Sequence, residues 1–98
     1  MEVEFADKTL RRLYSEAGYT AGYPPEVERG FRKVVGLIRN ADHERSLAGF
    51  VGLRMEKLKG DRAHQRSLRI NGKWRLIIEL REGEDGKLVA IIEIVDYH

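Results

Sequence analysis

The last stretch of the chain, residues 91–98 (Ile-Ile-Glu-Ile-Val-Asp-Tyr-His), constrains the fold more than any other. It reads as an apolar β-strand that runs directly into three polar residues. A strand this apolar requires neighbouring strands on both edges and a covering layer on at least one face. The polar tip combines residue types capable of proton transfer and of hydrogen bonding to phosphate: Asp96, Tyr97 and His98.

The preceding residues, from position 50 onward, show the period of two that is typical of strands. The pattern predicts strands at 53–58, 67–70, 74–80 and 89–95, joined by turns at 59–62, 71–72 and 82–86. Asn71-Gly72 favours a type I′ hairpin turn, because both central residues of that turn have positive φ. The second half of the chain is therefore expected to form an antiparallel meander.

The strand at 74–80 has two distinct faces. One face carries Trp74, Leu76, Ile78 and Leu80, and the other carries Arg75, Ile77 and Glu79. We expect the first face to pack against helices, because it is entirely apolar. The second face is then partly open to solvent and carries Arg75.

The first half of the chain supplies the helices. We expect a strand at 2–6, a helix capped by Asp7, a loop at 18–23, a helix from Pro24-Pro25 to Asn40, and a helical turn from Asp42 to Leu47. The fold class is α+β: an N-terminal strand at a sheet edge and two helices packed on one face of a mainly antiparallel sheet. Residues 1–98 are expected to form one domain.

The composition limits the kinds of site and the cellular location that we expect for this chain. The chain has 98 residues and no cysteine, so disulfides and thiolate metal sites are excluded. No apolar run reaches the roughly 20 residues of a membrane span, and residues 1–4 do not resemble a signal peptide. His43 and His64 stand in polar stretches without ligand spacing. We expect a cytoplasmic protein with no metal, no cofactor and no membrane association.

Charge is unevenly distributed, although the formal net charge is only +2. Residues 51–81 contain nine Lys/Arg and three Asp/Glu, whereas residues 1–50 contain eight of each. A positive band inside a nearly neutral protein is typical of a phosphate-binding face, and equally of a solvated strand face with mixed charges.

RNA cleavage without a metal needs a base for the 2′-OH, charge stabilisation at phosphorus and an acid for the 5′-oxygen. His98 suits either proton role, Asp96 can orient it or act as the base, and Tyr97 can hydrogen-bond phosphate. Arg75 and Lys59 are candidates for the electrostatic role. Further candidates for RNA or phosphate binding are Lys57, Arg62, Arg66, Arg69 and Lys73.

Each of these residues also has a structural interpretation. A terminal histidine is commonly exposed without function, and Lys59 and Arg62 could simply decorate a turn. Arg75 could pair with Glu79 or Asp96. If the last strand pairs with the strand at 74–80, however, its tip reaches the same end of the sheet as Arg75.

Three segments together resemble the HigB branch of the RelE/ParE toxin superfamily: Leu58-Lys59-Gly60-Asp61-Arg62, Asn71-Gly72-Lys73-Trp74-Arg75 and Asp96-Tyr97-His98. The helix beginning Lys8-Thr9-Leu10 and the loop before Pro25 are similar to that family as well. The resemblance implies a RelE-like, microbial-ribonuclease-like fold. It also implies a toxin that cuts mRNA in the ribosomal A site without metal and leaves a 2′,3′-cyclic phosphate. The family's catalytic positions match Lys59, Arg75, Asp96, Tyr97 and His98.

The resemblance also implies partners. A helix-turn-helix antitoxin (HigA-like) neutralises such a toxin, and the complex binds operator DNA through the antitoxin. The chain departs from the family pattern at Glu56, where many relatives carry a histidine, and at Gln65 and Arg66, where aromatics are frequent. Two alternatives stay open: a ParE-like toxin that inhibits DNA gyrase, and a catalytically inactive RNA- or protein-binding module on the same fold.

Overall fold

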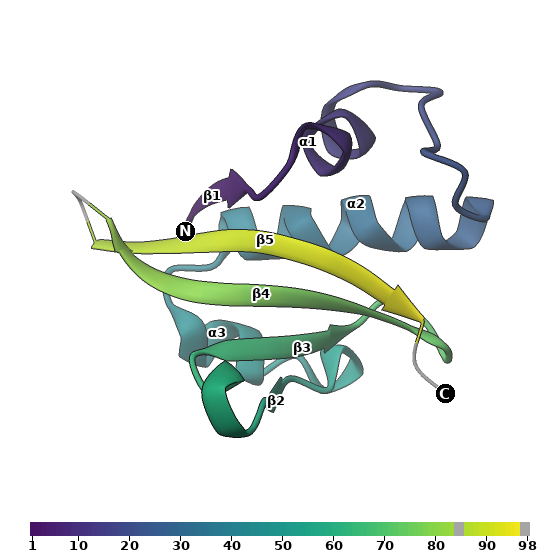
Figure 1. Ribbon diagram of the computed structural model, residues 1–98. Coiled ribbons are helices and arrows are strands. Elements are labelled where there is room, and N and C mark those ends of the chain that lie inside the picture. Colours follow the sequence, from purple (N-terminus) through teal and green to yellow (C-terminus); the bar gives the residue numbers. More distant parts are fainter. Residues whose placement is uncertain (84–85, 97–98) are drawn as a thin grey trace.

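The computed structural model describes residues 1–83 and 86–96 (Figure 1). The chain order is β1 (Glu2–Phe5), α1 (Lys8–Ser15), α2 (Pro25–Asn40), α3 (Glu44–Ala48), η1 (Val51–Leu53), β2 (Glu56–Lys57), η2 (Gly60–Arg62), β3 (Gln65–Arg69), β4 (Trp74–Gly83) and β5 (Gly86–Asp96), where η denotes a short 3-10 helix.

The strands form one sheet in the order β1-β5-β4-β3-β2. β1 lies parallel to β5, with Phe5 opposite Ile91, and every other neighbouring pair is antiparallel. The apolar β5 thus has a strand on each edge, as the sequence predicted. The predicted α+β class, with the N-terminal strand at a sheet edge, is confirmed.

The helices begin where the sequence indicated. The Asp7 carboxylate accepts a hydrogen bond from the Leu10 N–H at 2.8 Å and caps α1. α2 begins at Pro25, whose missing N–H costs nothing in the first turn. α3 differs from the expectation: His43 stands at its N-cap without a side-chain hydrogen bond, so Asp42 is not the cap.

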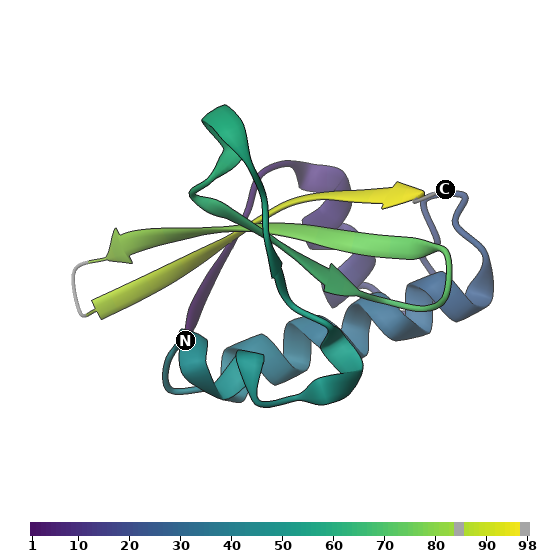
Figure 2. The same ribbon diagram turned by 90° about the horizontal axis from the view of Figure 1, so that it is seen from below.

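The core lies between the helices and one face of the sheet. The sheet contributes Leu68, Leu76, Ile78, Val89 and Ile91, all completely buried, and α2 contributes Val27, Phe31, Val34, Val35 and Ile38. Trp74 packs at the border of this core, where its ring meets the Tyr23 ring edge-on at 5.7 Å. The prediction that Trp74, Leu76 and Ile78 face the helices is therefore correct. Figure 2 shows α2 on one side of the sheet and the turn around residue 61 on the other.

Gly30 explains how closely α2 approaches the β3–β4 hairpin. A Cβ built at Gly30 would stand 2.5 Å from Cγ2 of Ile70 and 3.2 Å from its carbonyl oxygen. Gly36, one and a half turns later, has nothing within 4 Å of the same position. Gly30 therefore serves close packing, which offsets its low helix propensity.

Two local predictions are wrong. The predicted strand at 53–58 is only two residues long, because Arg54 adopts a left-handed conformation (φ 44°) and Val51–Leu53 forms a 3-10 helix instead. The 71–72 turn is not type I′, because neither Asn71 nor Gly72 has positive φ. The hairpin is real but has a four-residue connection, with Arg69 ending β3 and Trp74 beginning β4.

Candidate phosphate-binding site

Two arginines face each other on the open side of the sheet. Arg69 on β3 is the direct cross-strand partner of Arg75 on β4, and both alternate with core-facing leucines. The Ile70 N–H donates to the Trp74 carbonyl at 2.9 Å, so the neighbouring 69/75 pair is of the non-hydrogen-bonded kind, in which side chains come closest. Like charges placed directly opposite one another destabilise a sheet. The arrangement thus favours an anion between or above the two guanidinium groups.

The turn before β4 holds the Arg75 guanidinium in place. Its Nη1 donates to the carbonyl oxygens of Asn71 at 2.8 Å and Trp74 at 3.1 Å. The Asn71 side-chain oxygen in turn accepts hydrogen bonds from the N–H groups of Lys73 and Trp74, both at 3.0 Å. Sequence reasoning treated Asn71 only as a turn residue and missed this positioning role. Its potential for side-chain-to-backbone bonding was the available signal.

The tip of β5 reaches the same end of the sheet. A β-bulge opposite Ile77 and Ile78 inserts one residue into β5, which explains why Ile91 and Ile94 both face the core. The shifted register brings Asp96 opposite Trp74, and its carboxylate stands 4.0 Å from the Lys73 ammonium. The predicted catalytic residues Tyr97 and His98 lie outside the described residues.

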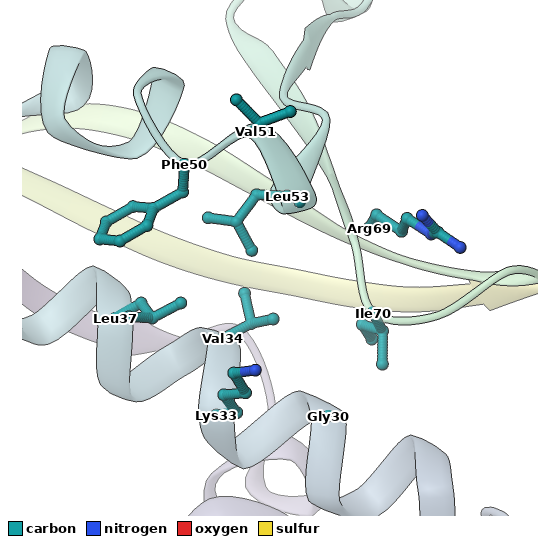
Figure 3. Close-up of a pocket in the computed structure, with 10 residues that line it drawn as sticks. Gly30, Lys33, Val34, Leu37, Phe50, Val51, Leu53, Arg69 and Ile70 are labelled. Carbon is teal, nitrogen blue, oxygen red and sulfur yellow. The ribbon is translucent and has the colours of Figure 1, made fainter.

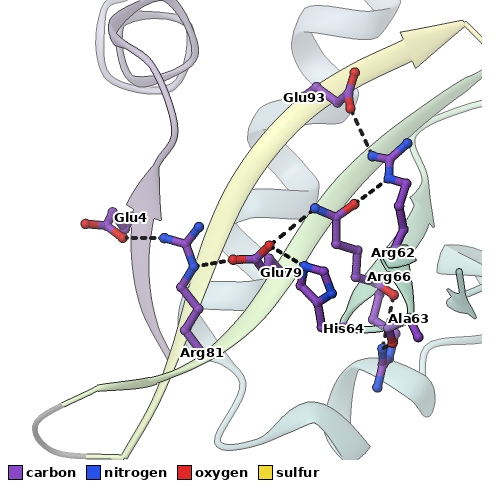
Figure 4. Close-up of polar contacts among 9 residues, drawn as sticks. Glu4, Arg62, Ala63, His64, Arg66, Glu79, Arg81 and Glu93 are labelled. Carbon is purple, nitrogen blue, oxygen red and sulfur yellow. Dashed lines mark hydrogen bonds and ion pairs between the residues drawn. The ribbon is translucent and has the colours of Figure 1, made fainter. Parts of the chain in front are cut away.

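The middle of the open face is occupied by a polar network (Figure 4). Glu79 on β4 pairs with Arg81, with His64 at 2.9 Å, and accepts a hydrogen bond from Gln65 at 3.3 Å. The Arg81 hydrogen bond, with smaller contributions from Gln65 and the charges of Arg81 and His64, holds the pKa of Glu79 below its ordinary value. Arg81 extends the network to Glu4 on β1 at 3.2 Å. The charges of this network are therefore matched by one another.

Arg62, predicted to bind phosphate, is engaged within this face. It donates to the Gln65 side chain at 2.8 Å and reaches across β4 to Glu93 on β5 at 3.0 Å. Ile77 lies between these strands and is buried although it faces away from the main core. Lys59, at the start of the same turn, is exposed.

Arg66 and Lys57 lie on the other side of the sheet. Arg66 is the neighbour of Ile78, and Lys57 is the neighbour of Arg66, so both follow the core-facing register. The Arg66 guanidinium pairs with Glu44 of α3 at 2.9 Å and donates to the Ala63 carbonyl at 3.0 Å, leaving its side chain 16% exposed. Arg66 and Arg69, both predicted to bind RNA or phosphate, therefore lie on opposite faces of the sheet, because successive strand residues face opposite sides.

Glu56, where relatives of the family often carry histidine, lies on the open side. It stands opposite Ser67, which is itself opposite Ile77 and two residues before Arg69. The departure from the family pattern is therefore placed beside the arginine pair rather than at a remote position. The sequence could indicate the residue but not its face, because β2 is too short to show alternation.

The described residues contain no group of three or more His, Asp or Glu side chains arranged to hold a metal ion. None of the helices in this part of the chain combines the length and apolar character needed to cross a bilayer.

This fold is shared by small toxins of known structure. A YoeB/ParE toxin from Agrobacterium tumefaciens superimposes with a TM-score of 0.61 over 100% of both chains, at 22% identity. YafQ from Escherichia coli strain BL21(DE3) superimposes with a TM-score of 0.61 at 13% identity, covering 97% of this chain and 91% of the other. Sheet topology and helix placement are thus those of the fold found in these two toxins.

The sequence narrows the class to one family. Toxin HigB-1 of Vibrio cholerae serotype O1 (strain ATCC 39315 / El Tor Inaba N16961) is 29% identical over 98 residues, which is 100% of this chain and 98% of the relative. The sequence model of the HigB-like toxins, described as the RelE-like toxin of the type II toxin–antitoxin system HigB, matches residues 3–98. The chain belongs to this family, and membership implies an antitoxin partner.

Proposed function

We propose that the protein is a ribosome-dependent mRNA endonuclease whose phosphate-binding element is the cross-strand pair of Arg69 and Arg75. The observation that carries the proposal is the strand register, which makes Arg69 and Arg75 direct cross-strand partners on the open face. Two arginines on adjacent strands of one face can donate together to the oxygens of a phosphodiester. Lys73, which precedes β4 and is 64% exposed, adds a third cation at the same end of the sheet.

The reaction is in-line attack of the 2′-OH on the adjacent phosphate. The O2′–P bond forms, the P–O5′ bond breaks, and the products are a 2′,3′-cyclic phosphate and a 5′-hydroxyl. One proton leaves O2′ and another reaches O5′, so no water is consumed in this step. Arg75 and Lys59 stabilise the charge that develops on the phosphorus oxygens.

Proton transfer is assigned to the tip of β5. His98 carries one proton role, Asp96 orients it or acts as the base, and Tyr97 hydrogen-bonds the phosphate. Asp96 ends β5 beside Lys73, which supports a site at this end of the sheet. Three or four scattered cations give little grip on free RNA, so the ribosome must present the message.

A reconstituted reaction tests this proposal. Purified protein is added to ribosomes programmed with a defined mRNA, and the 3′ ends of the products are analysed for 2′,3′-cyclic phosphate. We expect cleavage only with ribosomes present, and none by a variant that lacks residues 97–98. Cleavage at the same positions by the shortened chain would remove the β5 tip from the mechanism.

A further inference from the structure

An apolar groove lies on the other side of β3, between α2 and the segment 50–53 (Figure 3). Its volume is about 410 Å³. The apolar residues that line it include Val34 and Leu37 of α2, Leu53 of η1, and Ile70 of the hairpin. The groove opens at the end of β3, where Arg69 contributes to its lining.

The rim of the groove exposes large apolar side chains. Phe50 is 45% exposed and Val51 is 85% exposed, and they are the exposed large hydrophobic residues within ranges 1–83 and 86–96. Both stand at the start of η1, where the Phe50 ring points toward Leu37 of α2 and the Val51 side chain points away from α2 (Figure 3). Adjacent apolar side chains over an apolar groove mark a surface that a protein partner covers.

The charged residues that line the groove are all positive. Its lining includes two cations, Lys33 from α2 and Arg69 from β3, and no carboxylate. An apolar segment that also carries acidic side chains complements this pattern. A nucleic acid fits less well, because Val34, Leu37, Val51 and Leu53 offer neither stacking nor hydrogen bonds.

We infer that the antitoxin anchors an acidic-apolar segment in this groove, with an apolar side chain packed against Phe50, Leu53 and α2 and a carboxylate on Lys33. Family membership supplies the partner, and the lining of the groove indicates the side chains that the partner brings to it.

Binding of the purified antitoxin encoded beside the toxin gene tests the inference. Val51→Asp removes the apolar rim at a highly exposed position, and Lys33→Glu reverses a charge on the exposed face of α2. Each should weaken the antitoxin complex by about tenfold or more, as loss of a central interface residue commonly does. Lys8→Glu, on α1 and away from the groove, is the matched control and should leave the dissociation constant within about twofold.

The same variants are assayed for ribosome-dependent mRNA cleavage without antitoxin. Val51→Asp and Lys33→Glu should cut as the parent protein does. Unchanged antitoxin affinity in both folded variants would overturn the inference. Unchanged affinity with lost cleavage would overturn it in favour of RNA or ribosome binding at the groove. If the parent protein cuts no mRNA, the proposed function fails, while the affinity measurements still decide the antitoxin site.

Discussion

Arg69 and Arg75 are direct partners across β3 and β4, with their side chains on the same open face of the sheet. Like charges directly opposite one another repel across a sheet. The adjoining turn holds Arg75 in this position through two backbone carbonyls. Two cations held side by side in this way are suited to bind a phosphodiester.

Replacing Arg69, one member of the pair, should make the fold more stable. We expect Arg69→Gln to raise the free energy of unfolding by about 0.5 kcal/mol at low salt, because the cross-strand repulsion disappears. This gain in unfolding free energy should shrink at high salt, because salt screens the repulsion between Arg69 and Arg75 in the parent protein. Thermal denaturation at low and high ionic strength measures it. Destabilisation by Arg69→Gln at low salt would show that the two charges do not repel appreciably.

Asn71 should control activity through Arg75. Asn71→Ala leaves the N–H groups of Lys73 and Trp74 without their side-chain acceptor, at a cost of about 1 kcal/mol. Because the same turn holds the Arg75 guanidinium, cleavage should fall more than stability does. Asn71→Ser retains a weaker acceptor and should give intermediate cleavage rates. Equal rates for all three proteins would mean that the turn does not position Arg75.

Two glycines of α2 should respond in opposite directions to the same change. Gly30→Ala drives a methyl group into Ile70 and should destabilise the fold by about 1–3 kcal/mol. Gly36→Ala meets no neighbouring atom and should stabilise it by about 0.5–1 kcal/mol, since alanine is the better helix former. Urea denaturation of the two variants provides the comparison. A stabilising Gly30→Ala would show that the hairpin can move away from α2.

The Glu79 network should give the fold an acid-sensitive component. The pKa of Glu79 is lowered in the folded state, chiefly by its hydrogen bond from Arg81. Its contribution is therefore present above the unfolded-state pKa of about 4.3 and is lost as the pH falls through the folded-state value. We expect the parent protein to lose about 0.5–1 kcal/mol more than Glu79→Gln between pH 7 and pH 3. If the parent protein and Glu79→Gln lose the same free energy of unfolding over this pH range, Glu79 does not have this role.

Much of the fold could be predicted because its patterns are local. The Asp7 cap, Pro25 and the alternation from Trp74 to Leu80 each specify their own element. The failures have other causes. The strand register turns Arg66 to the helix side, where it pairs with Glu44, 22 residues earlier, and the 3-10 helix at 51–53 interrupts the predicted second strand.

The site was predictable in part for the same reason. Arg75 could be assigned to the open face because it stands between Trp74 and Leu76, which face the core. Three other features depend on strand register or on contacts between side chains and could not be predicted. They are the cross-strand pairing of Arg69 with Arg75, the hydrogen bonds that Asn71 accepts in the turn, and the ion pair of Arg62 with Glu93. The roles of Tyr97 and His98 remain predictions.

The most direct test of the account is the map of mRNA 5′ ends in cells that express the parent protein, Arg75→Ala or Arg81→Ala. Arg81 is the matched control, since it lies on the same strand and face and forms ion pairs with Glu79 and Glu4, away from the Arg69–Arg75 pair. The parent protein and Arg81→Ala should arrest growth and produce the same cuts within codons. Folded Arg75→Ala should produce neither, because one lost phosphate donor costs about 10²–10³ in rate. Identical cuts with Arg75→Ala, or growth arrest by the parent protein with cleaved gyrase complexes and no mRNA cuts, would contradict the account.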